Sequence, residues 1–278
     1  MKRTSKFLAV GAAVLIIGVV IWVIGMSIIG WDFYRLDNTE YTARSYACED
    51  EVKSISVSLS SFPLTVKRGE RVSLDYYEAD NSEVFVEEKD GVLSVVEKYQ
   101  YSPFKSGLFN IGRTSHKFTL TVVSGAKLEI NGNNSDISIE DADFEDFSMH
   151  STNANIRFTR VKFGKLNIKS TNCDLTLNGC KASGMTVKST NLDITAKNCE
   201  FDSAVIDGTN VDCELEMVKL NMLSLDAVNL DADIEIVGNQ NEYTVQTSGR
   251  GMPAHRTGTT DKLIKLSGTN NDVDLKFV

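Results

Sequence analysis

The stretch Ser170-Thr171-Asn172-Cys173-Asp174-Leu175-Thr176-Leu177 decides the fold, because it returns nineteen residues later as Ser189-Thr190-Asn191-Leu192-Asp193-Ile194-Thr195-Ala196. The pattern runs from Leu128 to Ile236 and is marked by a tripeptide that ends in asparagine. The tripeptides are Gly132-Asn133-Asn134, Ser151-Thr152-Asn153, Ser170-Thr171-Asn172, Ser189-Thr190-Asn191, Gly208-Thr209-Asn210 and Ala227-Val228-Asn229. Two residues after these asparagines stand Asp136, Asn155, Asp174, Asp193, Asp212 and Asp231.

Apolar residues two apart flank each corner, such as Leu166 and Ile168 before Asn172 and Leu175 and Leu177 after it. A period of nineteen residues is too short for a helical hairpin, and apolar pairs between polar corners indicate three short strands per turn. The repeat therefore predicts an all-β fold: a single-stranded parallel β-solenoid with 19-residue rungs. We favour a right-handed coil because parallel crossovers usually are right-handed. A left-handed hexapeptide-type coil stays open as the alternative.

Equivalent residues of successive rungs are expected to stack about 4.8 Å apart, so that the apolar columns form one continuous core. Asparagine suits a repeated corner, because it tolerates the left-handed backbone conformation and its amide can bond the amide of the next rung. We therefore predict a structural asparagine ladder at this corner.

The N-terminus carries a membrane-spanning pattern. Lys2, Arg3 and Lys6 precede an uncharged run from Phe7 to Gly30, and acidic residues follow it. This run is long enough to cross a bilayer, lacks a small-residue cleavage site, and has its positive charges on the N-terminal side. It predicts a signal anchor (7–30) with a cytoplasmic tip (1–6) and an extracytoplasmic remainder. A cleaved secretory signal is the alternative.

Residues 31–52 are mostly polar and lack a period, so we interpret them as a stalk. Residues 53–278 then form one extracytoplasmic solenoid domain, with irregular rungs at its N-terminal end. Gly268-Thr269-Asn270 repeats the corner motif near the C-terminus. The formal net charge of -9 argues against a nucleic-acid surface.

The early alternating strands, the segment from Phe118 to Ile130 and the recurring Thr-Asn-x-Asp-Leu-x-Leu corners resemble the bacterial putative-adhesin β-strand repeat family. The resemblance covers Lys53 to Val278, although that family more often has Gly-Asp-Ile at the corner. It implies a membrane-anchored envelope protein, of a type associated with envelope stress, whose biochemical function is unknown.

Two groups of residues are candidate partner-binding sites. The first is the aromatic set on the long segment between Tyr99 and Lys117, because exposed aromatics on a loop often bind: Tyr99, Tyr101, Phe104 and Phe109. The second is a basic band in the middle rungs, which could orient a protein partner or a polyanionic wall polymer: Arg157, Arg160, Lys169 and Lys188. A hairpin over the solenoid end and a merely solvating surface are the respective alternatives.

We expect neither a catalytic site nor a bound cofactor. The three histidines, His116, His150 and His255, are far apart in the sequence and no nucleophile can be joined to them. A carbohydrate-active β-helix would need carboxylates clustered in a cleft. Cys180 and Cys199 occupy one inward column and are read as stacked buried thiols, since parallel Cβ directions suit a disulfide poorly.

Asp174, Asp193, Asp212 and Asp231 would stack at the rung spacing and repel one another by roughly 3 kcal/mol per pair at an effective dielectric near 20. Two remedies are available. Each carboxylate can accept backbone N–H bonds at its own corner, or Ca²⁺ can bind between rungs. We favour local capping, because the glycine-rich repeat of calcium-binding β-rolls is missing.

The sequence thus predicts a single-pass cell-membrane protein with a cytoplasmic N-terminus. Its β-solenoid would act as a non-catalytic envelope binding, adhesin-like or scaffolding module that contacts a wall polymer or another membrane protein. An accessory sensor of an envelope-stress response is the alternative, and a carbohydrate-active enzyme is a more distant one.

Overall fold

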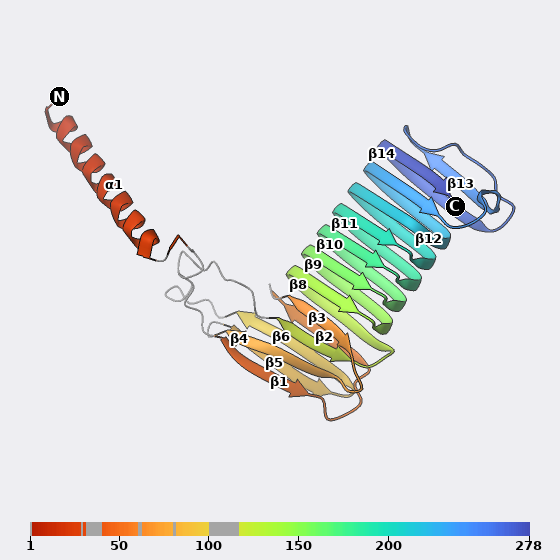
Figure 1. Cartoon of the computed structure of the whole chain (residues 1–278), viewed down its shortest axis with the longest axis horizontal. Coiled ribbons are helices and arrows are strands. Elements are labelled where there is room, and N and C mark those ends of the chain that lie inside the picture. Colours follow the sequence, from red (N-terminus) through yellow and green to blue (C-terminus); the bar gives the residue numbers. More distant parts are fainter. Residues whose placement is uncertain (1, 29, 32–40, 61–62, 80–81, 100–116) are drawn as a thin grey trace.

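The computed structural model describes residues 2–28, 30–31, 41–60, 63–79, 82–99 and 117–278 (Figure 1). Its one long helix, α1 (Lys2–Ile28), precedes a β-structure that occupies the rest of the described chain. Within α1, Val10–Ile28 has a mean hydropathy of 2.5 over 19 residues and is long and apolar enough to cross a membrane. Both an anchor and a signal sequence would have this composition.

The predicted β-solenoid is confirmed. Strands pair in parallel with a shift of nineteen residues, so that Leu166 lies beside Met185 and Asn172 beside Asn191. Figure 1 shows the resulting ladder of similar rungs from β8 to β14. Its strands are β8 (Ala126–Glu140), β9 (Asp143–Thr159), β10 (Lys162–Asn178), β11 (Lys181–Lys197), β12 (Glu200–Ile236), which runs through two rungs, and β14 (Lys262–Phe277).

Each regular rung is one bent strand and not three short ones, which corrects the expectation from the sequence. β9, β10 and β11 each have 17 residues, and the pairing continues through the Ser-Thr-Asn corner. The strand survives the bend because the corner residues keep their partners on the neighbouring rungs. Ser170, for example, pairs with Ser151 on one side and Ser189 on the other.

The left-handed backbone lies at a second corner, and this also differs from the expectation. The ladder asparagines have no positive φ. Five residues with φ between 52° and 63° close one rung onto the next and form one column: Asp141, Arg160, Gly179, Asn198 and Met217. The Ser-Thr-Asn corner therefore bends gradually, while the second corner turns sharply.

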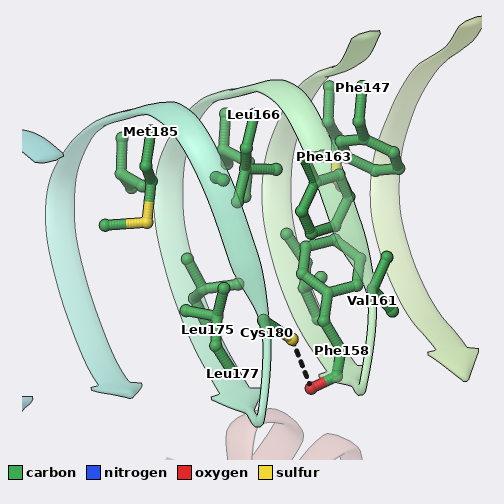
Figure 2. Packing of buried hydrophobic residues seen from close by; sticks show 14 of the residues in the cluster. Phe147, Phe158, Val161, Phe163, Leu166, Leu175, Leu177, Cys180 and Met185 are labelled. Atoms are coloured by element: carbon green, nitrogen blue, oxygen red, sulfur yellow. Dashed lines mark hydrogen bonds between the residues drawn. The ribbon is translucent and has the colours of Figure 1, made fainter. Parts of the chain in front are cut away.

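Inward side chains of successive rungs form one core (Figure 2). Leu175 and Leu177 have no exposed surface, and Ile168 is 2% exposed. The ring of Phe158 lies edge-on to those of Phe147 and Phe163, with centroids 5.2 and 5.1 Å apart. Burial of aromatic side chains in such edge-to-face contacts makes a large contribution to the stability of a core.

The N-terminal rungs are stacked out of chain order. β2 (Ser54–Leu59) pairs in parallel with both β8 and β6 (Val92–Tyr99), and β3 (Leu64–Arg68) pairs in parallel with both β8 and β7 (Phe118–Val122). The rung made by β2 and β3 thus lies between β8 and the later segments β6 and β7. Antiparallel strands finish this end: β5 (Ser82–Lys89) on β6, β4 (Ser73–Ala79) on β7 and β1 (Tyr41–Ala47) on β4.

The second half of the predicted stalk belongs to the β-structure. β1 pairs with β4 over seven residues, and Cys48 and Val52 are 0% and 2% exposed. Glu88 fastens the connection after β1, because its carboxylate accepts the backbone N–H groups of Glu49 and Asp50 at 3.0 and 2.8 Å. The alternation in this segment was too short to reveal a strand whose partner is distant in the sequence.

The C-terminal end of the ladder is covered by β13 (Tyr243–Ser248), which pairs with β14, and by the segment that joins them. A short 3-10 helix, η2 (Gln240–Glu242), leads into β13. The hydroxyl of Tyr243 donates to the carbonyl of Leu220 at 2.8 Å, and the guanidinium of Arg256 lies 5.0 Å from the ring centroid of Phe277. These contacts cover the last apolar rung.

Candidate functional site

A long groove runs along the Asn-x-Asp corners of the ladder and has a volume of about 970 Å³. We call it the corner groove. One wall is the asparagine ladder and the other is an acidic wall, and between them lies an apolar floor. The ladder is Asn134, Asn153, Asn172, Asn191, Asn210, Asn229 and Asn270; the acidic wall is Asp136, Asp174, Asp193, Asp212, Asp231 and Asp272, with Asn155 in the second place; the floor is Ala154, Cys173, Leu192, Val211 and Leu230.

The predicted asparagine ladder is confirmed. Nδ2 of each asparagine donates to Oδ1 of the one before it, from Asn153 to Asn270, at distances of 2.6 to 2.8 Å. An amide has two N–H donors and two acceptor lone pairs, so one ladder bond in each direction uses only half of the capacity of an amide such as that of Asn172. Serine hydroxyls stabilise the bend of the backbone at the same corner. Oγ of Ser170, for example, donates to the carbonyl of Asn172 at 2.7 Å.

The apolar floor is formed by the residue between each asparagine and aspartate. Its members are only 3 to 7% exposed, because alternate residues of a strand point to opposite faces and this position points inward. Burial, followed by the nearby charge of Asp174, raises the pKa of the Cys173 thiol to about 12. A thiol with so high a pKa stays protonated and behaves as a small apolar group.

The acidic wall lacks the local caps that the sequence analysis favoured. In the described part of the chain, the carboxylates of Asp174, Asp193, Asp212 and Asp231 accept no hydrogen bond and form no ion pair. They are exposed, so water screens their repulsion. Partial burial and then the charges of Asp212 and Asp174 nonetheless raise the pKa of Asp193.

Other acidic residues of the same rungs are paired, which sets the wall apart. Lys181 contacts Glu200 at 2.6 Å, Lys188 contacts Asp207 at 3.1 Å, and Lys197 contacts Glu214 and Glu216 at 3.0 and 2.7 Å. The carboxylates of the groove therefore lack, within the described part of the chain, the lysine partners that neutralise these other acidic residues. Among the described residues, no three His, Cys, Asp or Glu side chains lie close enough together to hold a metal ion.

The structure separates the four basic candidates. Arg157 projects from the strand after the asparagine corner, and Arg160 sits at the sharp corner, where it contacts Asp141 at 2.7 Å and also Glu140. Lys169 and Lys188 share one column with His150. Lys169 and His150 line a second, polar depression of about 540 Å³ on the other side of the asparagine ladder. Whether these residues bind a partner stays a prediction.

Of the aromatic candidates, Tyr101, Phe104 and Phe109 lie outside the described residues, and Tyr99 ends β6. The first strand after this segment is placed near the groove: the N–H of Phe118 donates to the carbonyl of Pro63 at 2.9 Å, and Pro63 lines one end of the groove. The binding role of the aromatic set stays a prediction.

The groove itself was missed from the sequence. The sequence analysis predicted the asparagine and aspartate columns but not the apolar column between them. Its apolar run through Ala154, Cys173, Leu192, Val211 and Leu230 is the signal that could have indicated an apolar floor between two polar walls.

The two described histidines do not line the corner groove. Neither His150 nor His255 makes a hydrogen bond or ion pair with a described side chain. All five cysteines are free and buried: Cys48, Cys173, Cys180, Cys199 and Cys213. The hydrogen bond between Cys180 and Cys199 lowers the pKa of the first thiol and raises that of the second. The Sγ of Cys180 also lies 3.4 Å from the carbonyl oxygen of Phe158 (Figure 2).

A repeating β-solenoid with an asparagine-lined corner defines the general class of this protein. More specifically, the chain belongs to the Toastrack DUF4097 family, whose model matches residues 52–275. Of the curated proteins, none matches it.

Solved structures that match this chain include a putative adhesin from Bacteroides fragilis NCTC 9343, with 14% identity and a TM-score of 0.46 over 86% of this chain and 97% of that one. A second putative adhesin, from Parabacteroides merdae ATCC 43184, has 14% identity and a TM-score of 0.39 over 87% and 97%. A putative cell adhesion protein from Clostridium sporogenes ATCC 15579 has 10% identity and a TM-score of 0.26 over 86% and 100%.

Proposed function

We propose that this chain is a single-pass membrane protein whose β-solenoid acts outside the cytoplasm as a non-catalytic, adhesin-like binding module. The corner groove is its ligand-binding face. The observation that carries this proposal is the groove of about 970 Å³ with an apolar floor between a hydrogen-bonded asparagine wall and an acidic wall. Binding sites combine apolar surface with a few placed polar groups, and this groove does so on a rigid scaffold.

The anchor part of the proposal is supported by α1. Its apolar span, Val10–Ile28, follows Lys2, Arg3 and Lys6, and positive charge favours the cytoplasmic side of a membrane. The test is a C-terminal epitope tag after Val278. Protease added to intact cells from which the wall has been removed should destroy the tag, and the tag should fractionate with membranes. A tag that is protected, or is released into the medium, contradicts the anchor.

The binding part is tested by retention of the full-length protein, in detergent micelles, on isolated cell-envelope material. We compare it with a variant that places two long cationic side chains over the groove, Asp193→Arg with Asp212→Arg. A matched control changes two acids away from the groove, Asp233→Arg with Glu235→Arg, which line a separate depression of about 220 Å³.

We expect the groove variant to lose retention while the control keeps it, because only the first pair lines the corner groove. Equal retention of both variants would show that the groove is not the binding face. A wild-type protein that is not retained contradicts the binding role itself.

A further inference from the structure

The acidic wall is a row of carboxylates that have no ion-pair partner among the described residues and that repeat from rung to rung. In the register of the parallel strands, Asp174 lies beside Asp193 and Asp193 lies beside Asp212. Further along, Asp231 lies beside Asp272. Parallel strands lie about 4.8 Å apart, so the carboxylates repeat at about that distance. From Asp174 to Asp272 the row is continuous, whereas Asn155 interrupts it at the other end.

The chemistry of the groove excludes several occupants. Anions are repelled by the wall. A compact metal ion prefers several oxygen ligands around one point, but the described residues bring no three acidic, histidine or cysteine side chains together. The remaining type of ligand is long, carries positive charges at intervals, and has apolar segments between them to lie on the floor of Cys173, Leu192, Val211 and Leu230.

We propose that the corner groove binds a linear polyamine whose amines are separated by three methylene groups, an inference that rests on the proposed function of the groove. Four single bonds of about 1.5 Å in a zigzag place neighbouring nitrogens about 5 Å apart. This matches the spacing of the carboxylates along the wall. Successive ammonium groups pair with Asp174, Asp193 and Asp212, while the methylene groups contact the floor.

The opposite wall completes the site. After ladder formation, Oδ1 of Asn153, Asn172 and Asn191 has accepted one ladder bond and keeps a second lone pair, which can accept an N–H of the ligand. The amide nitrogens of the ladder are donors only, so this wall offers acceptors across the floor from the carboxylates only through Oδ1.

The test is calorimetric titration of the full-length protein in nanodiscs of zwitterionic phosphatidylcholine, which avoids binding of the amine to anionic lipid. The probes are two triamines of equal charge, bis(3-aminopropyl)amine and bis(hexamethylene)triamine. We expect the first to bind roughly tenfold more tightly because its spacing matches the wall, and we expect its affinity to fall in high salt.

The variant Asp193→Asn with Asp212→Asn should weaken binding of bis(3-aminopropyl)amine roughly tenfold, since it removes two ion pairs and keeps the shape of both side chains. The control Asp233→Asn with Glu235→Asn keeps the wild-type affinity. Circular dichroism melting curves confirm that both variants are folded.

Equal affinity for the two triamines, equal weakening in both variants, or no measurable binding at low salt overturns the proposal. The envelope-retention experiment separates this failure from that of the proposed function. If the arginine variant loses retention but no triamine binds, the groove is a binding face for another ligand. If the triamine binds as expected but the arginine variant is still retained, the adhesin-like role of the groove fails while the polyamine site stands.

Discussion

At the residue scale, the most demanding position is the sharp corner between rungs. Left-handed backbone costs a non-glycine residue roughly 1 kcal/mol or more, yet only Gly179 is a glycine in the column that also holds Asp141, Arg160, Asn198 and Met217. Aspartate and asparagine tolerate this conformation, and Arg160 is held there by Asp141 and Glu140. Met217 has none of these compensations and is 42% exposed.

We therefore expect Met217→Gly to stabilise the protein by about 0.5 kcal/mol, because relief of backbone strain outweighs the greater freedom of glycine in the unfolded chain. Gly179→Ala should destabilise it by about 1 kcal/mol, since φ is +63° and an added Cβ would otherwise fit, with its nearest atom 3.6 Å away. Urea unfolding measures both changes. Destabilisation by Met217→Gly would show that its side chain matters more than its backbone.

The acidic wall gives a second prediction at this scale. The pKa of Asp193 is raised in the folded protein, so folding is favoured below the usual Asp pKa of about 3.9 and this contribution is lost as the pH rises through the folded pKa. Asp193→Asn should consequently raise the melting temperature slightly at pH 7, and the difference from wild type should vanish near pH 3.

The control is Asp207→Asn, which removes the ion pair with Lys188 and should not stabilise the protein. A lower melting temperature for Asp193→Asn at neutral pH would instead indicate a local cap on this carboxylate.

At the element scale, the regular strands were predictable because one nineteen-residue period fixes every inward position at once. The bend at Ser170-Thr171-Asn172 was misread as a strand end, since polar residues at a corner look like a loop although their backbone stays paired. The strand in the predicted stalk was missed for a different reason. β1 pairs with β4, more than twenty-five residues away, and a strand with a distant partner has no local signal.

The alternation within β10 predicts opposite effects for two adjacent substitutions. Leu177→Asp should unfold the solenoid, because it places an unpaired carboxylate at a position with no exposed surface, at a cost of several kcal/mol. Thr176→Asp should be tolerated, because Thr176 points outward and lies beside Arg157. Circular dichroism and melting curves compare the two, and similar loss of structure in both would contradict the inward and outward assignment.

At the scale of the whole molecule, the sequence predicted the solenoid but not the order of its rungs. The regular rungs stack in the order of the sequence, because the side-chain columns of each repeat match those of the next repeat. The irregular strands carry no columns that distinguish one neighbour from another, so the position of β2 between β6 and β8 was not readable. The corner groove was missed similarly, because it belongs to the stacked array and no single repeat displays it.

The stacked core and the asparagine ladder stabilise the folded protein without a metal ion, so its stability should not depend on divalent ions. We expect the same melting temperature for the full-length protein in excess chelator and in millimolar calcium, because the described residues form no cluster that could hold a metal ion. A rise in calcium that disappears in the double variant Asp193→Ala with Asp212→Ala would show that the acidic wall binds the ion between rungs.

The interleaved N-terminal rungs have a consequence for biosynthesis. Because a chain is synthesised from its N-terminus, β2 and β3 are made before β8. Their partners in β8 lie some seventy residues later in the sequence. At a synthesis rate of about 5–20 residues per second, these strands wait for several seconds with unpaired edges. Lys67 and Arg68 end β3 as exposed cations, and charges at an edge discourage pairing with other nascent chains. The completed end then carries antiparallel strands, so the ladder cannot be extended there by a second molecule in the same parallel register.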